Sequence, residues 1–335
     1  MLLAALTLFL LYTPYPRPLR NVVFDGYQRM FPLERTVDPV ALVMIDEEAL
    51  AKYGQWPWPR TRMAELVTQI SKDEPLSIGL DIIYAEPDRL SPTMIADELP
   101  ILPTNLAQAL RALPTNDQVL ADAMRGRNVV LGIGAGDPDP RFQAPPRAAP
   151  VITKGERVEG LKTFTGHIGN IRVLDDAATG RGLLNAGQPE QVVRVVPLVE
   201  RVQGVIVPSL GVEALRVAAG AGIRIGDAPA GLLTLSFDQV DTRMQDDGTT
   251  WLRISHADDS RYISAARVLE GKVDSDSIRN KVVLVGMSGL GVQDFKTTPL
   301  GEFVPGVTMH AQVIENLFNG VSLTRPAIMV YSEAM

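Results

Sequence analysis

The sequence predicts an α/β fold in which a mostly parallel (mixed) sheet has helices on both faces, in a Rossmann-like arrangement. Apolar runs such as VALVMI and VVLV lack polar alternation, which is typical of strands buried on both faces. The first such strand is followed by an amphipathic helix and a second strand, the spacing of a parallel crossover. A hairpin pattern in the middle of the chain adds an inserted antiparallel hairpin.

The composition is that of a globular protein, and it excludes several functions. Of 335 residues, 46% are apolar and 21% are charged, and the net charge is -7. This acidic balance argues against a nucleic-acid partner. The chain has no cysteine, which excludes thiol chemistry, disulfides and cysteine–zinc sites, and three histidines argue against a histidine-rich metal site. We expect no cofactor.

Hydrophobic ends predict a membrane-anchored chain. The run MLLAALTLFLLY predicts that residues 1–13 are a transmembrane helix with a truncated start, because twelve helical residues reach only about 18 Å. A short buried or interfacial helix is the alternative. Residues 14–38 then form a juxtamembrane segment, residues 39–325 the main domain, and residues 326–335 the start of the next transmembrane segment.

The first half of the domain alternates strands and helices. Pro39 introduces the first strand, and Gly54 ends the short helix after it. The proline-rich residues 86–116 interrupt the pattern and predict a long surface excursion with one helix. The strands predicted here cover residues 40–45, 77–84 and 128–133, and the helices cover residues 47–52, 61–71, 105–112 and 117–124.

The second half begins with the hairpin, whose two extended runs meet at Gln203 and Gly204. Ser209 then fits the N-cap of a helix. Near the end of the chain, a glycine turn and a TTPLG loop separate a buried strand from the last helix. The other elements predicted here are strands over residues 232–237, 251–255 and 282–285, and helices over residues 209–219, 262–270 and 306–320.

The loop QWPWPR offers the clearest candidate binding residues. Proline prevents both a regular helix and a central strand, so the loop holds Trp56, Trp58 and Arg60 rigidly near the end of the first strand. These side chains suit a wall that stacks on a ligand and binds an anion. The alternative is a hydrophobic plug that closes the core, with Arg60 paired to an acid.

Carboxylates at the strand ends allow a second kind of site. Asp81 lies inside an apolar strand, so it needs a partner, which is either a ligand or metal or a capped backbone turn. Asp46, Glu47 and Asp81 at neighbouring strand ends would suit magnesium or calcium, but no sequence signature supports such a site.

The glycine turn GMSGLG matches neither the dinucleotide motif GxGxxG nor the P-loop. It is either a ligand-binding edge or a tight structural turn. A hydrolase would use Ser288 as nucleophile, His310 as base and Asp46 or Asp294 as the orienting acid. The GxSxG elbow is missing, which argues against this alternative.

Several segments resemble the CHASE sensor family of the second type, which forms extracytoplasmic domains of bacterial cyclases, histidine kinases and related receptors. The resemblance covers roughly residues 39–323, and its most specific pieces are WPWPR and TTPLG followed by PGV and HA. The sequence departs from the family pattern at GMSG and in the long excursion over residues 86–116. The resembling segments are VALVMIDEEAL, GQWPWPRTRM, SIGLDIIYAEP, RVVPLV, VPSLGVEAL, YISAARVLEG and the block over residues 281–320.

The resemblance implies a sensory domain that is not itself an enzyme. The expected place is the bacterial cytoplasmic (inner) membrane, with the main domain in the periplasm and a cyclase, kinase or similar output domain beyond the membrane helices. We expect contact with the lipid bilayer through flanking helices, a homodimer, and a small-molecule or protein signal. An envelope hydrolase and a structural dimerisation module are the alternatives. The hypothetical signal-facing residues are Asp46, Trp56, Trp58, Arg60, Asp81, Ser288, Asp294, Thr297 and Thr298.

Overall fold

The computed structural model describes residues 16–147, 149–185, 192–289, 294–321 and 323–325. The expected membrane helix near the N-terminus and the expected start of a second one after Arg325 lie outside these residues. None of the helices in the described ranges is long and apolar enough to span a bilayer.

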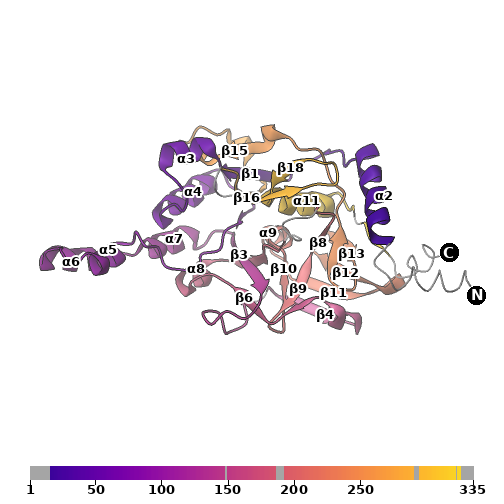
Figure 1. Ribbon diagram of the computed structural model, residues 1–335, viewed down its shortest axis with the longest axis horizontal. Coiled ribbons are helices and arrows are strands. Elements are labelled where there is room, and N and C mark those ends of the chain that lie inside the picture. The colour runs from indigo at the N-terminus through magenta and orange to yellow at the C-terminus, as the bar shows by residue number, and fades with distance from the viewer. Residues whose placement is uncertain (1–15, 148, 186–191, 290–293, 322, 326–335) are drawn as a thin grey trace, which may run out of the picture.

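A seven-stranded sheet forms the centre of the molecule (Figure 1). All its strand pairs are parallel except the β3–β6 pair, which is antiparallel. The last strand of this sheet in the chain, β16, lies between β1 and β2. The spatial order is β15 (Tyr262–Ser264), β1 (Val40–Ile45), β16 (Val282–Met287), β2 (Ser77–Leu80) and β3 (Val129–Gly136), with β6 (Gly166–Ile168) and β7 (Gly180–Leu183) both paired to β3.

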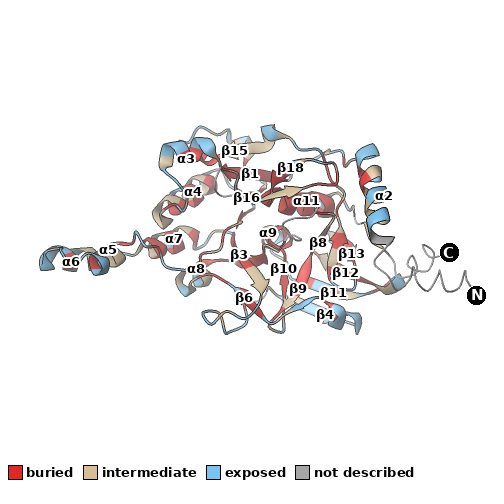
Figure 2. Ribbon diagram, viewed as in Figure 1, coloured by how far each residue is buried: buried red, intermediate tan, exposed pale blue. Residues whose placement is uncertain are grey.

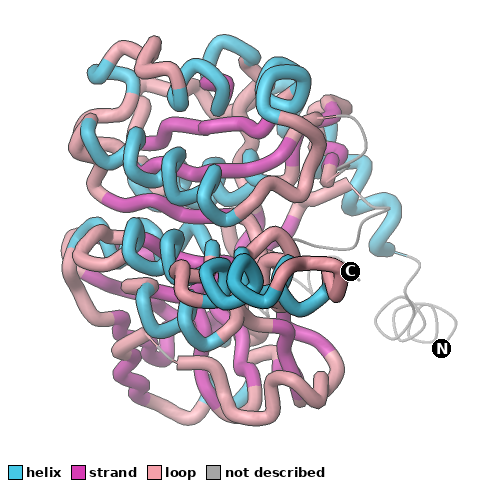
Figure 3. Tube along the Cα trace, turned by 90° about the vertical axis from the view of Figure 1, so that its left-hand side faces the viewer, coloured by secondary structure: helices cyan, strands magenta, loops and turns pink. Residues whose placement is uncertain are grey.

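Helices cover both faces of the sheet, as predicted, and Figure 3 shows the strands between them. Alternate side chains of β1 enter two separate cores: Leu42 packs with α9 and α11, and Val43 packs with α3, α4, α7, α8 and α10. The burial of both faces explains the continuous apolar runs. The helices are α2 (Pro16–Met30), α3 (Glu47–Tyr53), α4 (Arg60–Lys72), α5 (Pro92–Glu98), α6 (Thr104–Arg111), α7 (Asn116–Met124), α8 (Arg172–Ala177), α9 (Leu210–Ala219), α10 (Ala265–Leu269) and α11 (Val307–Phe318).

Mostly antiparallel strands form a second β region beside α9 and α11, in which the β4–β11 and β5–β9 pairs are parallel. The predicted hairpin is confirmed: β9 (Val199–Val202) and β10 (Val205–Pro208) pair across the turn at Gln203 and Gly204. A four-stranded sheet with the order β13-β12-β11-β4 was not expected from the sequence. The remaining strands are β4 (Val151–Lys154), β5 (Thr163–Phe164), β8 (Val195–Pro197), β11 (Ile223–Ala228), β12 (Leu232–Phe237), β13 (Val240–Met244), β14 (Thr249–Trp251), β17 (Phe295–Thr297) and β18 (Phe303–Pro305).

Four local predictions were wrong. The strand expected over residues 251–255 is not formed, because strand β14 ends at Trp251 and the next four residues are irregular. Strand β2 ends at Leu80, so Asp81 and the residues after it form an irregular segment. Residues 262–270 are not one helix, because their first part pairs with β1 as strand β15 before α10 begins. The excursion contains two helices, α5 and α6, which project from the body of the molecule as a largely exposed arm (Figure 2).

Glycines allow α9 to approach its neighbours closely. A Cβ on Gly211 would lie 2.7 Å from the carbonyl oxygen of His310 in α11. A Cβ on Gly182 of β7 would lie 2.4 Å from the Cα of Leu210. Neither neighbouring atom is a flexible side-chain tip, so a methyl group can fit only if the backbone moves.

Replacement of Gly211 by alanine should therefore destabilise the fold. We expect Gly211→Ala to lower the free energy of unfolding by about 1–3 kcal/mol, the usual cost of overpacking, in urea titrations. Gly136→Ala is the control, since no atom lies within 4 Å of its added methyl group. Equal stabilities of these two variants would contradict the close α9–α11 contact.

Candidate functional site

Asp46 follows β1 directly, and its carboxylate is used within the fold. Its Oδ1 accepts hydrogen bonds from the Ala49 backbone N–H at 2.9 Å and from the Ser264 hydroxyl at 2.8 Å. The first bond caps α3, where the free N–H groups favour a carboxylate. The second bond ties β1 to the residue that precedes α10. Asp46 therefore joins two elements at the carboxyl edge of the sheet.

The two tryptophans of the WPWPR loop pack against the core. Trp58 is 1% exposed, and its indole N–H donates to the Gly54 carbonyl at 2.7 Å. Trp56 is partly buried, with its ring centroid 6.4 Å from that of Trp58. The hydrophobic-plug alternative thus describes the position of Trp58 well, because its large apolar ring fills the interior.

Arg60 begins α4, and acidic and aromatic groups surround it. Its guanidinium carbon lies 4.5 Å from the ring centroid of Tyr84, and its Nε lies 3.6 Å from Oδ1 of Asp117. Its terminal nitrogen donates to the Glu86 carbonyl at 3.3 Å, while its backbone N–H donates to Asp88 at 2.7 Å. The arginine is therefore paired to an acid, although its Nε lacks a hydrogen-bond partner among the described residues.

A cavity of about 450 Å³ opens beside Arg60. Proline, tryptophan and aliphatic side chains meet a few charged groups in its wall, the mixture found in sites for small organic molecules. The cavity is lined by Pro57, Trp58, Arg60, Ile83, Ala85, Glu86, Pro87, Asp88, Arg89 and Leu90. Arg60 would meet an acidic group of an occupant, and the apolar residues would meet its hydrocarbon part.

A second group of candidate residues surrounds Asp81. Burial and the neighbouring Asp294 raise the pKa of Asp81 to about 7, against the effect of Lys296. Burial also lowers the pKa of His310 to about 4, so its imidazole is neutral at neutral pH. Lys296 Nζ lies 2.7 Å from Asp294 Oδ1, and the Asp294 carbonyl accepts from the Gly306 N–H just before α11. This Asp81 cluster therefore contains a carboxyl group that titrates near neutral pH beside the start of α11.

The other predicted residues lie along the turns that follow β16. Ser288 is partly buried, and its backbone N–H donates to the last carbonyl of β1 at 3.2 Å. Thr297 is partly buried at the end of β17. Thr298 is 2% exposed and closes a turn, because its hydroxyl accepts from the Glu302 N–H at 3.3 Å. Residues 290–293 of the glycine turn lie outside the described residues.

The hydrolase and metal alternatives gain nothing from this geometry. His310 is 4% exposed, and the charged groups that act on its pKa are Asp294 and Lys296. Within the described parts of the chain, no group of three or more histidine, aspartate or glutamate side chains is placed to hold a metal ion. The Asp46 carboxylate, proposed for a metal site, is already bonded to Ala49 and Ser264.

The contacts divide the predicted residues into separate groups. Asp81 and Asp294 share one electrostatic cluster, whereas Arg60 lines a cavity whose wall includes Ile83, two residues after Asp81 in the chain. Sequence reasoning missed Lys296, which neutralises part of the Asp81 cluster, and Asp117, the acidic partner of Arg60. Asp117 lies in the first turn of α7, where an acid already fits a helix start, so the sequence carries no separate signal for it.

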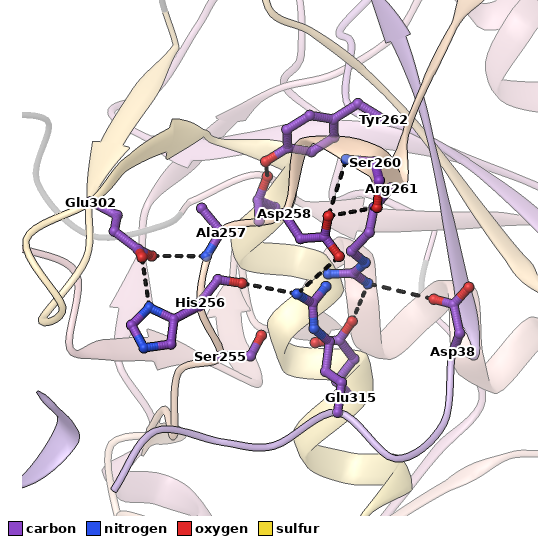
Figure 4. Close-up of polar contacts among 12 residues, drawn as sticks. Asp38, Ser255, His256, Ala257, Asp258, Ser260, Arg261, Tyr262, Glu302 and Glu315 are labelled. Carbon is purple, nitrogen blue, oxygen red and sulfur yellow. Dashed lines mark hydrogen bonds and ion pairs between the residues drawn. The ribbon is translucent and has the colours of Figure 1, made fainter. Parts of the chain in front are cut away.

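A partly buried ionic network attaches the residues before β1 to α11 (Figure 4). Arg261 forms an ion pair with Glu315, which is 0% exposed, and lies 3.8 Å from Asp38. Arg35 lies 3.5 Å from Asp258 in the same network. Burial raises the pKa of Glu315, whereas Arg261 and Arg35 act in the opposite direction. Loss of Arg261 would leave a buried carboxylate without its counter-ion.

Residues 249–255, here called the bridging segment, are bound on one edge by α2. Gln28 of α2 is 0% exposed, and its Nε2 donates to the Leu252 carbonyl at 3.1 Å. Its Oε1 accepts from the Ile254 N–H at 3.1 Å. One side-chain amide thus replaces a strand partner for two backbone groups. The Asp25–Arg194 pair, with two contacts of 2.7 Å, holds α2 on the same region.

The other edge of the bridging segment is bound by α11 and by residues near the end of the described chain. Asn316 accepts from the Arg253 N–H at 3.0 Å and donates to the Arg253 carbonyl at 2.8 Å. Gln312 accepts from the Ser255 N–H at 3.2 Å. The Trp251 N–H donates to the Leu323 carbonyl at 3.1 Å. The bridging segment therefore connects α2 with α11 directly.

Asp81→Asn should remove a pH dependence of stability. The pKa of this carboxyl is about 7 in the folded chain and about 3.9 in an unfolded one, so the folded chain binds an extra proton between these values. The contribution of Asp81 to the free energy of unfolding is therefore fully present below about pH 4, where the carboxyl is protonated in both states. It is lost as the pH rises through 7, because ionisation of the buried carboxyl is unfavourable. Urea titrations from pH 4.5 to 7.5 should show a smaller loss for the variant, by on the order of 2 kcal/mol.

His310 provides the matched control, because its contribution to stability changes with pH in the opposite direction to that of Asp81. Because burial lowers its folded pKa to about 4, the wild type loses this residue's contribution as the pH falls from about 6.5 toward 4. His310→Gln should lose less stability over that acidic interval. Identical pH profiles of the wild type and Asp81→Asn would contradict the assigned environment of Asp81.

A test for hydrolysis distinguishes the envelope-hydrolase alternative from a sensory domain. Because Ser288 has no base assigned by the geometry, the purified chain should not hydrolyse p-nitrophenyl acetate or p-nitrophenyl phosphate above the buffer rate. Ser288→Ala should then give the same baseline. A turnover in the wild type that Ser288→Ala abolishes would support an envelope hydrolase instead.

Comparison with known families gives one result that covers the chain. The family model described as CHASE2 domain matches residues 2–334. The search of curated proteins and the search of solved structures give no match. CHASE2 domains are extracytoplasmic sensory, non-catalytic domains of membrane receptors. With a match over essentially its whole length, this chain belongs to the CHASE2 domain family.

Proposed function

We propose that this chain is the periplasmic sensory domain of a receptor in the bacterial cytoplasmic membrane. It passes an external signal through flanking membrane helices to a cytoplasmic nucleotide cyclase, histidine kinase or similar output domain. The observation that supports this proposal most directly is the bridging segment, which binds α2 on one edge and α11 and Leu323 on the other.

The start of α2 and the last described residues lie side by side. Arg20 and Phe24 of α2, Trp251 of the bridging segment, and Leu323 and Arg325 line one cavity of about 230 Å³. A shift of the bridging segment would therefore act on both connections of the domain. Displacement of one helix end relative to another is a common form of signal transfer.

Helix α11 offers a route from the candidate site to the bridging segment. The Asp81 cluster includes His310 in the first turns of α11, and Gln312 and Asn316 bind the bridging segment further along the same helix. A ligand that prefers one position of α11 would shift the balance between two arrangements of the domain. Asp294 and Lys296 act on the pKa of both Asp81 and His310, and the Asp294 carbonyl accepts from the Gly306 N–H just before α11.

The proposed signal-facing surface lies at the carboxyl edge of the sheet. The cavity beside Arg60 suits a small molecule with an acidic group, and the partly buried strand ends suit either a small molecule or a protein. The proposed surface keeps the nine residues Asp46, Trp56, Trp58, Arg60, Asp81, Ser288, Asp294, Thr297 and Thr298. Trp58 and Asp46 would act by holding this edge in shape, since their polar atoms are bonded within the fold.

Breaking the bridging segment's contacts should uncouple the domain. In membranes that contain a receptor with this chain, Gln28→Ala and Asn316→Ala should each change the basal cyclase or kinase rate by about fivefold or more, the lower range of coupling between sites. The direct measurement is the rate of product formation in isolated membranes, with thermal melting of the purified chain as the test of folding.

Asn185→Ala is the matched control for these two variants. Asn185 also makes a paired amide contact, since its Nδ2 donates to the Ala135 carbonyl at 2.9 Å and its Oδ1 accepts from the Ala135 N–H at 2.8 Å. It contacts neither α2 nor the bridging segment by these bonds, so the output rate should stay at the wild-type value. Folded Gln28→Ala and Asn316→Ala receptors with unchanged output would refute the proposed route.

A further inference from the structure

Helix α2 has the reverse of the usual amphipathic arrangement. The side chains that it turns toward the domain include Asp25 and Gln28, which are buried and bonded to Arg194 and to the bridging segment. Its outward face is apolar, and we call it the α2 face. The α2 face consists of Leu19 (70% exposed), Val22 (68%), Val23 (65%), Tyr27 (47%) and Met30 (68%), with Phe31 (54%) directly after the helix.

A solvent-facing apolar stripe of this size indicates a partner. The other amphipathic helix near the N-terminus, α4, behaves in the usual way and turns Met63, Leu66 and Ile70 into the core. Polar hydrogen bonds and the contact of Phe24 with Trp251, whose ring centroids lie 4.8 Å apart, hold α2 on the domain. The side chains of the α2 face are not needed for that attachment. Contiguous exposed apolar surface on a soluble domain marks an interaction site.

We propose that the α2 face is a dimerisation surface, and that its occupant is the α2 face of a second copy of this chain in a parallel, two-fold symmetric pair. This inference goes beyond the sensory role and does not depend on it. The pair would place like residues opposite each other, as symmetric interfaces do. The six side chains of the face are uncharged, so their pairing opposes no like charges. The exposed Arg29 lies at the edge of the face, two turns after Val22, and its Nε donates to the Pro299 carbonyl at 3.1 Å.

The spacing of the face fits a helix partner. Leu19, Val22, Val23, Gly26 and Met30 follow one another at intervals of one, three or four residues, which places them in one stripe. Gly26 has no atom within 4 Å of an added Cβ, so the stripe has a notch at its middle where a second helix can approach closely. The stripe is therefore long and narrow enough to pack against a single helix of a partner.

The area is that of a modest interface. Six side chains that each expose on the order of 100 Å² supply roughly 600 Å² per protomer, so a symmetric pair buries about 1,200 Å², the lower end for specific complexes. The cavity of about 230 Å³ lined in part by Phe24, Tyr27 and Trp251 borders the face and offers room for partner side chains. We therefore expect a dimer that dissociates measurably on dilution.

A membrane surface is the competing occupant, and the charges of α2 favour the second copy. An interfacial helix needs basic residues on its polar side to reach lipid headgroups. Two basic residues of α2 each contact the domain: Arg20 stacks over Trp251 at 5.8 Å, and the exposed Arg29 donates to the Pro299 carbonyl at 3.1 Å. These cations are thus already engaged by the protein.

The absence of cysteine from the chain allows a direct test by disulfide cross-linking. Single substitutions Val22→Cys and Gly26→Cys, introduced into the full 335-residue chain, should form disulfide-linked dimers on mild oxidation. Ile152→Cys, at a position that is 69% exposed on β4, is the matched control and should remain monomeric. Equal cross-linking at all three positions would overturn the proposal.

A charge variant tests the same surface without a cross-link. Val23→Glu places a carboxylate opposite its own copy, so the dimer dissociation constant measured by sedimentation should rise at least about tenfold. The melting temperature of the monomer should stay unchanged, because Val23 is 65% exposed. A wild type that is monomeric at all concentrations would overturn the proposal.

Vesicle flotation distinguishes the membrane from the second copy. With vesicles of phosphatidylcholine and phosphatidylglycerol, binding of the wild type and of Val23→Glu should be equal if the α2 face pairs with itself. Reduced flotation of Val23→Glu with an unchanged dissociation constant would assign the face to lipid and overturn the proposal. None of these measurements uses a signal or an output domain, so the proposed function is tested separately.

Discussion

The position of β16 between β1 and β2 is the constraint on which the rest of the structure depends. Six residues of β1 pair in register with β16, and the other edge of β16 pairs with β2. A strand buried on both faces needs hydrogen-bond partners on both edges, since no water can replace them. The first two strands of the sheet therefore complete their pairing only when the last one is in place.

The insertion of β16 between β1 and β2 also determines where the candidate site lies. The turn after β16 emerges between Asp46 and Asp81, and the chain then enters α11 beside Asp294 and Lys296. Asp81 combines a position near the apolar core with a neighbouring acid, and both effects raise its pKa. The same helix reaches the bridging segment through Asn316. The central position of β16, with α11 following it, thus connects the Asp81 cluster to the bridging segment, which contacts α2.

Polar contacts, more than apolar packing, attach α2 to the domain. A helix held by apolar packing would bury its hydrophobic stripe and lose it as an external surface. Gln28 and Asp25 avoid that outcome, because their bonds to the bridging segment and Arg194 leave the apolar stripe outward. The arrangement allows one helix to be fixed to its own domain on one side and to pair with another protein on the other.

The sequence by itself determined the α/β class, the doubly buried strands, the hairpin at Gln203 and the final helix, because hydrophobic periodicity and turn residues are local signals. It also identified Arg60, Asp81 and Asp294 as unusual. Only the tertiary structure decided that Asp117 pairs with Arg60, that Tyr262 starts a strand, and that Glu315 is buried against Arg261. The reason is physical: these facts depend on partners 54 or more residues away in the sequence, and periodicity carries no information about which distant backbone edge or charge will be nearby.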